Sequence, residues 1–220
     1  YGFVDKTGKV VIPLIYDDTR WFSEGLAGVE KNGKWGFIDK TGKVVIPPIY
    51  DDARHYFSEG LAAVGKNGKY GFVDKTGKVV IPLIYDNAGD FSEGLAGVGK
   101  NGKYGFVDKT GKVVVPLIYD SVGVFIEGWA VVKKNGKLGL IDKTGKVVIP
   151  LIYDNVGIFI EGLAEVEKNG KRGFVDKTGK VVVPLIYDYA YHFNNGEAKV
   201  RVDDEDFYID KEGRFLRYAD

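Results

Sequence analysis

The sequence predicts an all-β protein built from tandem repeats of about 34 residues, and three observations lead to this prediction. The segment 31–47 returns almost unchanged at residues 66–82, 100–116, 134–150 and 168–184. Gly and Pro fall every few residues, and the apolar runs are β-branched and about four residues long, which is strand length rather than helix length. Asn-Gly pairs stand between alternating apolar runs, and this is the strongest short-range signal for a β-hairpin.

One repeat can be divided into strands from its turn residues. Leu61–Lys66 and Lys69–Asp74 are predicted antiparallel strands around the Asn-Gly turn. The following D-K-T-G turn leads into a third strand at residues 78–81, because Asp can cap its own turn and Gly takes the left-handed position. Pro82 lacks an amide donor, so it ends the ladder or moves the strand to the sheet edge. Residues 83–86 form a fourth extended piece, followed by a loop.

Alternation along the first strand of each repeat predicts its buried face. The pair Ala-x-Val recurs in six copies, and the residue between the two drifts, so we expect the Ala/Val face to point inward and the drifting face outward. The drifting positions are Gly28, Ala63, Gly97, Val131, Glu165 and Lys199. A recurrent Tyr and a recurrent Phe in every repeat are the expected packing pieces between neighbouring repeats. A short meander cannot bury its own apolar face, so the repeats must share a core.

The chain is expected to form one repeat domain, 1–220. The repeats are predicted at residues 1–34, 35–69, 70–103, 104–137, 138–171 and 172–205, with a degenerate half-repeat or cap at 206–220. Glu197, Asp203-Asp204 and Asp206 replace apolar or turn residues in the last unit, as expected of a polar end cap. We therefore expect an open, twisted, solenoid-like β-array, and the alternative is a closed propeller-like or pinwheel toroid.

The repeated signature reads N-G-K-(W/Y)-G-F-(I/V)-D-K-T-G-K-V-V-(I/V)-P, followed by I-Y-D and then F-x-E-G-L-A. On these residues the whole chain resembles the bacterial WG-repeat family, also called KWG repeats. The resemblance implies a building unit that is reused in many bacterial proteins, and it implies no single activity. The Trp position departs from the family name in most copies, so we do not expect a shared ligand site there; its occupants are Tyr1, Trp35, Tyr70, Tyr104, Leu138, Arg172 and Asp206.

Composition excludes several classes of partner and site. Thirty-one basic and thirty-one acidic residues balance, which argues against nucleic acid as a partner. No apolar run approaches the ~20 residues needed to span a bilayer, so no membrane insertion is expected. The absence of Cys removes thiolate sites and disulfides. The chain has no Met and begins with Tyr1, so we expect a processed product or a segment of a longer protein.

The search for catalytic groups predicts that the chain is not an enzyme. Its two histidines, His55 and His192, lie four repeats apart, and no Ser-His-Asp arrangement or glycine-rich phosphate loop can be assembled. Asp recurs once in every D-K-T-G turn and once after every recurrent Tyr. A catalytic pair is normally unique, so these copies are interpreted as turn caps and as partners of the equally periodic Lys. No cofactor and no metal site are expected.

Recognition must use the positions that vary between repeats, because packing fixes the rest. The variable segments before the recurrent Phe hold residue types favoured at binding hot spots. These candidates are Arg20, Trp21, Arg54, His55, Tyr56, Tyr189, Tyr191 and His192. Two later segments are apolar instead, and they form either a local thickening of the core or an apolar patch for a partner. Its residues are Val124, Ile126, Trp129, Ile158 and Ile160.

Three classes of function are compared. The leading hypothesis is a non-enzymatic repeat scaffold that binds a protein partner, with self-association included. The alternative is a carbohydrate- or cell-wall-binding module, a polysaccharide partner stacking on Trp21, Tyr56, Tyr189 and Tyr191. An enzyme is the least favoured of the three classes, because the sequence contains no unique set of polar residues that could form a catalytic site.

Overall fold

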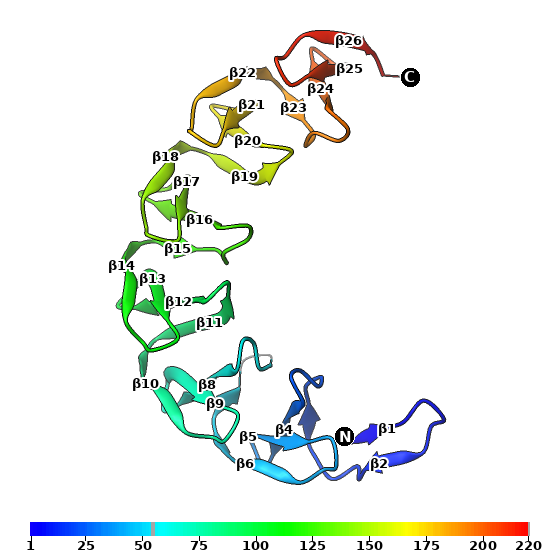
Figure 1. Cartoon of the computed structure of the whole chain (residues 1–220), viewed down its shortest axis with the longest axis vertical. Helices are drawn as coiled ribbons and strands as arrows, with labels where there is room; N and C mark the ends of the chain where they lie inside the picture. Colours follow the sequence, from blue (N-terminus) through cyan, green and yellow to red (C-terminus); the bar gives the residue numbers. More distant parts are fainter. Residues whose placement is uncertain (54–55, 220) are drawn as a thin grey trace. The chain divides into compact units, whose positions relative to one another are not determined.

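The computed structural model describes residues 1–53 and 56–219, so Arg54, His55 and Asp220 lie outside the described residues. The described residues form seven antiparallel sheets, which we name A to G in chain order. Sheet A has two strands and every other sheet has four, joined in sequence order as a meander (Figure 1).

The strands of sheets A to D are β1 (Phe3–Val4) and β2 (Val10–Ile12); β3 (Asp18–Thr19), β4 (Leu26–Lys31), β5 (Lys34–Asp39) and β6 (Val44–Tyr50); β7 (Asp52–Ala53), β8 (Leu61–Lys66), β9 (Lys69–Asp74) and β10 (Val79–Tyr85); and β11 (Asn87–Ser92), β12 (Leu95–Lys100), β13 (Lys103–Asp108) and β14 (Val113–Tyr119).

The strands of sheets E to G are β15 (Ser121–Val122), β16 (Trp129–Lys134), β17 (Lys137–Asp142) and β18 (Val147–Tyr153); β19 (Asn155–Ile160), β20 (Leu163–Lys168), β21 (Lys171–Asp176) and β22 (Val181–Tyr187); and β23 (Tyr189–Ala190), β24 (Glu197–Val202), β25 (Glu205–Asp210) and β26 (Phe215–Tyr218).

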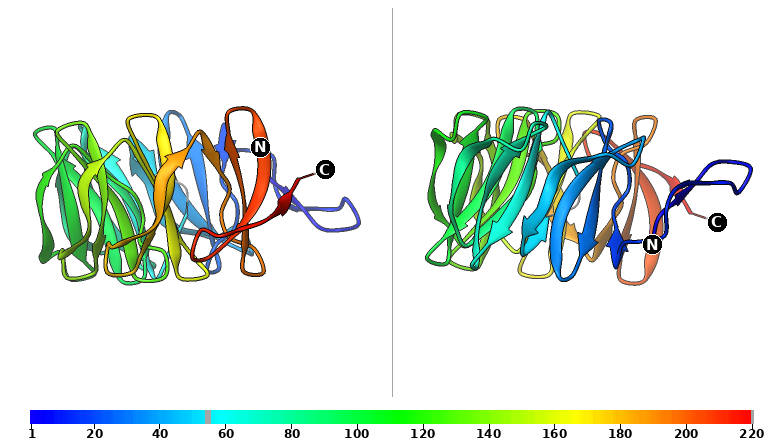
Figure 2. Two further views of the ribbon diagram at one scale, coloured as in Figure 1. Left: turned by 90° about the horizontal axis from the view of Figure 1, so that it is seen from above. Right: turned by 90° about the horizontal axis from the view of Figure 1, so that it is seen from below.

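The predicted fold class is confirmed: the chain is all-β and consists of repeated antiparallel meanders. None of the sheets in residues 1–53 and 56–219 closes into a barrel, and Figure 2 shows the turns at the two ends of each sheet. The contacts divide the chain into two compact units, Tyr1–Leu117 and Ile118–Asp220. No helix long and apolar enough to cross a membrane occurs among the described residues.

The boundaries of the repeat differ from the prediction at two places. Of the two expected effects of Pro82 the edge position is found, and the piece predicted at 83–86 is part of the same strand: β10 runs on through Pro82 to Tyr85, which pairs again with Tyr70 after a shift of register. The strand lies at the edge of its sheet, where a missing amide donor leaves no ladder hydrogen bond unmade. The segment predicted as a loop begins with a further strand: β11, for example, pairs with β12 and completes the next sheet.

The invariant Gly of each repeat is required by the path of this edge strand. A Cβ placed on Gly71 would lie 2.4 Å from the carbonyl oxygen of Ile81, just before Pro82. Sheet G provides the internal control, because β26 contains no Pro and the position equivalent to Gly71 is occupied by Phe207. Phe207 pairs directly with Tyr218. The Gly and the Pro are therefore one structural feature, in which the displaced edge strand leaves no room for a side chain.

Both faces of an inner sheet are buried, so the prediction that the drifting face points outward is wrong. Ala62 and Val64 of sheet C share a core cluster with Phe37 of sheet B, whereas Ala63 shares the next cluster with Val98 of sheet D. Ala63 is only 1% exposed. The reason is the stacking of sheets within the unit: one face packs on the preceding sheet and the other on the following one. The buried Ala/Val face is confirmed in all six copies.

The recurrent aromatic residues do pack between neighbouring sheets, as predicted. The Phe of one sheet meets the aromatic or apolar side chain on the second strand of the preceding sheet. Edge-to-face pairs join Phe37 to Phe57 at 4.9 Å and Phe174 to Phe193 at 4.7 Å between ring centroids. Such pairs contribute roughly 0.5–1.5 kcal/mol each beyond the area they bury. The recurrent Tyr is buried in every copy, and burial raises the pKa of Tyr50.

A glutamate clamp also joins neighbouring sheets inside each unit. Glu59, in the turn before β8, accepts a hydrogen bond from the Gly94 amide at 3.0 Å and an ion pair from Lys109 at 2.9 Å. Both partners belong to turns of sheet D. Equivalent contacts are Glu24 with Gly60 and Lys75, and Glu161 with Gly196 and Lys211. Each of these Glu residues has a positive φ of about 50°, a backbone conformation that disfavours L-residues.

Candidate functional site

The variable positions of each repeat meet on one face of its sheet. The Trp position on the second strand pairs with the first-strand residue two positions after the drifting one, such as Glu30 or Gly65. The short strand that precedes the first strand runs alongside. In sheet B the cross-strand pairs are Glu30 with Trp35 and Asp18 with Glu30. The Arg20 guanidinium lies 4.4 Å from the centroid of the Trp35 ring, and its Nη1 contacts Asp18 at 3.1 Å. Trp35 is thereby covered and is 6% exposed.

Sheets C and D fill the same cluster with a tyrosine that covers a glycine. The Tyr70 hydroxyl donates to Asp52 at 2.8 Å, and a Cβ on Gly65 would lie 2.9 Å from the Tyr70 ring. In sheet D a Cβ on Gly99 would lie 2.6 Å from the ring of Tyr104. Because the glycine on the first strand has no side chain, the aromatic ring can occupy the space above it.

Sheet F replaces the aromatic residue with a charge cluster. Arg172 contacts Glu165 at 2.7 Å and Glu167 at 3.1 Å, and its guanidinium lies 4.6 Å from the Tyr189 ring of sheet G. The side chains of Arg172 and Glu165 are each only 22% exposed. Burial raises the pKa of Glu165, although the charge of Arg172 opposes this shift.

Sheet G holds the same cluster with the charges reversed. Asp206 takes the place of Arg172 and contacts Lys199 at 2.8 Å and Arg201 at 2.6 Å. Hydrogen bonds from Arg201 and then Lys199 hold the pKa of Asp206 far below its usual range. Glu165, Glu167 and Arg172 thus correspond to Lys199, Arg201 and Asp206, one repeat later and opposite in sign.

The predicted binding residues that are described lie in or just after the two-residue strands β3, β7 and β23. Trp21 is 88% exposed, and Tyr56, Tyr189, Tyr191 and His192 are also exposed. Arg20 is half-buried against Trp35 rather than free on the surface. The structure brings Tyr189 and Tyr191 together, with ring centroids 5.1 Å apart. Arg20, Trp21 and Tyr56 belong to the first compact unit, and the other three belong to the second. Arg54 and His55 lie outside the described residues.

The predicted apolar patch is divided between surface and core. Val124, Ile126 and Ile158 are exposed. Trp129 is half-buried and meets Phe159 edge to face at 5.3 Å, so it thickens the core between sheets E and F. Ile160 is half-buried. Core thickening is therefore found at Trp129, and an apolar patch for a partner stays a prediction for the exposed residues Val124, Ile126 and Ile158.

A depression of about 400 Å³ lies on sheet G. Its lining combines tyrosine, histidine, amide and charged side chains: Tyr191, His192, Asn194, Asn195, Glu197, Lys199, Tyr208 and Arg217. A second hollow of about 470 Å³ lies between sheets E and F and is lined by Ile152, Tyr153, Lys168, Asn169, Val181 and Leu185.

The periodic aspartates make the contacts expected of turn caps and lysine partners. The Asp39 carboxylate accepts from the Thr41 amide at 2.8 Å and hydroxyl at 2.6 Å, and the Thr41 bonds keep the pKa of Asp39 low. Asp51 accepts from Lys34, in the other periodic series. Within residues 1–53 and 56–219 no group of three or more His, Asp or Glu is arranged to hold a metal ion.

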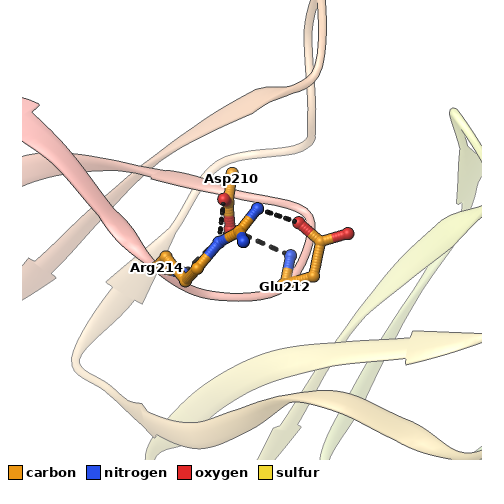
Figure 3. Close-up of polar contacts among 3 residues, drawn as sticks. All are labelled: Asp210, Glu212 and Arg214. Carbon is orange, nitrogen blue, oxygen red and sulfur yellow. Dashed lines mark hydrogen bonds and ion pairs between the residues drawn. The ribbon is translucent and has the colours of Figure 1, made fainter.

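The last turn departs from the others in sequence and keeps the same cap. Asp210 accepts from the amides of Glu212 and Arg214, at 3.0 and 2.9 Å (Figure 3). No Thr hydroxyl is present, and the Arg214 side chain instead contacts Asp210 at 2.6 Å and Glu212 at 2.9 Å.

The WG containing repeat model matches the chain six times, over residues 1–35, 35–70, 70–104, 104–137, 139–171 and 173–205. The chain belongs to the WG containing repeat family. No curated protein matches the chain by sequence.

Solved structures are similar to this chain at low sequence identity. A crystal structure described as the eukaryotic initiation factor is similar with a TM-score of 0.53 at 10% identity, over 98% of this chain and 69% of that one. Hsv2 of Kluyveromyces lactis has a TM-score of 0.45 at 10% identity, over 86% of this chain and 70% of that one. At 10% identity the similarity to the initiation-factor structure concerns the fold alone.

In this WG-repeat chain the Trp position varies together with its neighbours, a relation that inspection of that single position missed. Arg172 stands between two glutamates, Asp206 between a lysine and an arginine, and Tyr70 over a glycine. The signal was available in the sequence at the positions five and seven residues before each Trp position. In sheets C, F and G those positions change in step with the charge or size of the residue at the Trp position.

Proposed function

We propose that this WG-repeat chain is a non-enzymatic scaffold that binds a protein partner through the variable segment around Trp21, with Trp21 as the anchor. The observation that carries the proposal is the 88% exposure of Trp21, next to a sheet whose aromatic residues Trp35, Phe37 and Tyr50 are buried. A side chain this large and this exposed stabilises nothing in the fold of its own sheet. Trp and Arg are the residue types most enriched at binding hot spots.

The neighbour of Trp21 is already ordered for binding. Arg20 stacks on Trp35 and contacts Asp18, so its side chain loses little conformational freedom when a partner docks. Preorganisation of this kind lowers the entropic cost of association. The absence of catalysis is supported by the engagement of the periodic carboxylates as turn acceptors and lysine partners, which leaves them in structural roles.

The test compares Trp21→Ala with Tyr191→Ala, a matched exposed aromatic in the second unit. Proteins captured by the unaltered chain are identified, and their affinities are measured by titration. Loss of a hot-spot aromatic should cost about 2 kcal/mol, or roughly thirtyfold in affinity. Trp21→Ala should show this loss with an unchanged melting temperature, whereas Tyr191→Ala should bind normally. Full binding by Trp21→Ala, or no partner or self-association at all, would refute the proposal.

A further inference from the structure

Sheet G carries polar aromatic and charged residues where the inner sheets carry apolar ones. In sheet F, Phe174 pairs with Val183 on the face that packs against sheet G. The equivalent pair in sheet G is Tyr208 with Arg217. Leu163, which joins the same core cluster, corresponds to Glu197. The face that serves packing in sheet F is therefore a polar surface in sheet G, and the depression of about 400 Å³ lies on it.

The charged residues of the depression are held in fixed positions by ion pairs. Arg217 lies 4.3 Å from the centroid of the Tyr208 ring and contacts Glu197 at 2.7 Å. Lys199 contacts Asp206 at 2.8 Å. Each cation thus already contacts a carboxylate, with Asp206 shared between Lys199 and Arg201, so neither Lys199 nor Arg217 is left to form the main contact with an anionic ligand. The depression offers hydrogen-bond donors and acceptors side by side.

The exposed aromatic rings of the depression are not needed to keep the end of the repeat array soluble. Charged side chains alone keep the end of a repeat array polar. Tyr191 is nevertheless 52% exposed, and its ring is tilted against Tyr189. Tyr combines an apolar ring with a polar hydroxyl, a combination suited to a ligand that is apolar on one side and hydroxylated at its edge. A volume of this size lies in the range of about 300–1,000 Å³ typical of small-molecule sites.

We propose that the depression on sheet G is a carbohydrate-binding site for an uncharged hexose-based glycan. The C–H face of one sugar ring packs on the exposed ring of Tyr191. Adjacent hydroxyls, each a donor and an acceptor, pair with the neighbouring donors and acceptors of Arg217, Glu197 and the amide of Asn194. The site lies in the unit Ile118–Asp220 and is separate from the proposed Trp21 surface, so each can be present without the other.

The test titrates the isotope-labelled full chain with cellotetraose, maltotetraose and chitotetraose and follows amide resonances by NMR. At least one of these sugars should shift the resonances of residues 191–199, 208 and 217, with a Kd of about 1 mM or tighter. Tyr191→Ala should weaken binding at least tenfold, whereas Tyr191→Phe should retain it. Trp21→Ala is the control and should bind the sugar normally. If Tyr191→Ala does not fold, Arg217→Gln serves as the second variant.

Three outcomes would overturn the proposal. The first is the absence of shifts on sheet G with all three sugars at about 10 mM, tenfold above the expected Kd. The second is unchanged sugar affinity in both Tyr191→Ala and Arg217→Gln. The third is a set of shifts on sheet G that follows protein concentration and not sugar concentration, because the depression would then bind a second copy of the chain.

Discussion

Transplanting the charge cluster of sheet G into sheet F tests whether the Trp position and its neighbours form one set. Arg172→Asp alone places a third carboxylate between Glu165 and Glu167. Adding Glu165→Lys and Glu167→Arg then restores the arrangement that sheet G already contains. The single substitution should be strongly destabilising, and the triple variant should regain most of the lost stability.

The magnitude follows from distances and exposure. Arg172 contacts its two glutamates at 2.7 and 3.1 Å, and the three side chains are 22–24% exposed. Fully exposed ion pairs contribute roughly 0.2–1 kcal/mol, whereas breaking a buried pair costs about 3–5 kcal/mol. The cluster lies between these limits, and the reversed charge adds repulsion, so Arg172→Asp should lose about 3 kcal/mol. The triple variant still lacks the Arg172–Tyr189 contact and should remain about 0.5–1 kcal/mol below the parent.

Urea unfolding followed by circular dichroism measures these differences, with the double variant Glu165→Lys/Glu167→Arg as the control. The double variant gathers three cations at one place and should be destabilised about as much as Arg172→Asp. The three substitutions together must then be far from additive. If the triple variant is no more stable than Arg172→Asp, the three positions are independent and the reasoning is wrong.

Three further outcomes are expected. Gly71→Ala should lose roughly 1–3 kcal/mol in urea unfolding, because its Cβ would meet the carbonyl of Ile81; wild-type stability would disprove the account of the invariant Gly. Glu59→Ala should lose roughly 1–2 kcal/mol through the broken clamp, and Glu59→Gly should lose about 1 kcal/mol less, since Gly tolerates the positive φ; equal losses would exclude backbone strain. The hydrogen bond from Lys109 keeps the pKa of Glu59 below 4.5, so its contribution is present above pH 4.5 and should be lost as the pH falls through the folded-state pKa. Burial raises the pKa of Glu165 instead, so its contribution to folding stability should weaken as the pH rises above 4.5, and Glu165→Gln should remove this pH dependence. Acid unfolding profiles of Glu59→Gln and Glu165→Gln that are identical to the profile of the parent would contradict both statements.

The turn chemistry and the strand period predicted most of the fold. Asn-Gly and D-K-T-G placed the second and third strands correctly because these turns require specific backbone angles, which only a few residues supply. The Ala-x-Val alternation identified one buried face. The other face could not be predicted from alternation, because Gly28 and Ala63 resemble positions of low constraint. They are small because residues outside their own strand pack on them: Arg20 and Trp35 lie over Gly28, and sheet D packs on Ala63.

The candidate site was predictable by residue type and less so by contact. Exposure of Trp21 followed from its position outside the repeating Tyr and Phe set. The stacking of Arg20 on Trp35 did not, because fifteen residues of chain separate them and the pairing depends on the short strand β3, which the sequence suggested only as loop. The depression on sheet G likewise depends on a contact between strands: Tyr208 of β25 pairs with Arg217 of β26, in the register of the equivalent pair Phe174 and Val183 of sheet F.

The compensated clusters also indicate where so regular a chain can vary its surface. A residue at the Trp position that changes alone leaves a void, a clash or an unpaired charge, so changes there must be matched inside the same sheet. Trp21 and Tyr191 are under no such restriction, because their exposed rings fill no space in the stacked core. Substitution at those two places alters the surface without disturbing the clamp, the Gly–Pro pair or the buried Ala/Val face. Binding specificity in this WG-repeat chain should therefore reside in side chains that follow the two-residue strands, such as β3 and β23, where one repeat can differ from the next at little cost in stability.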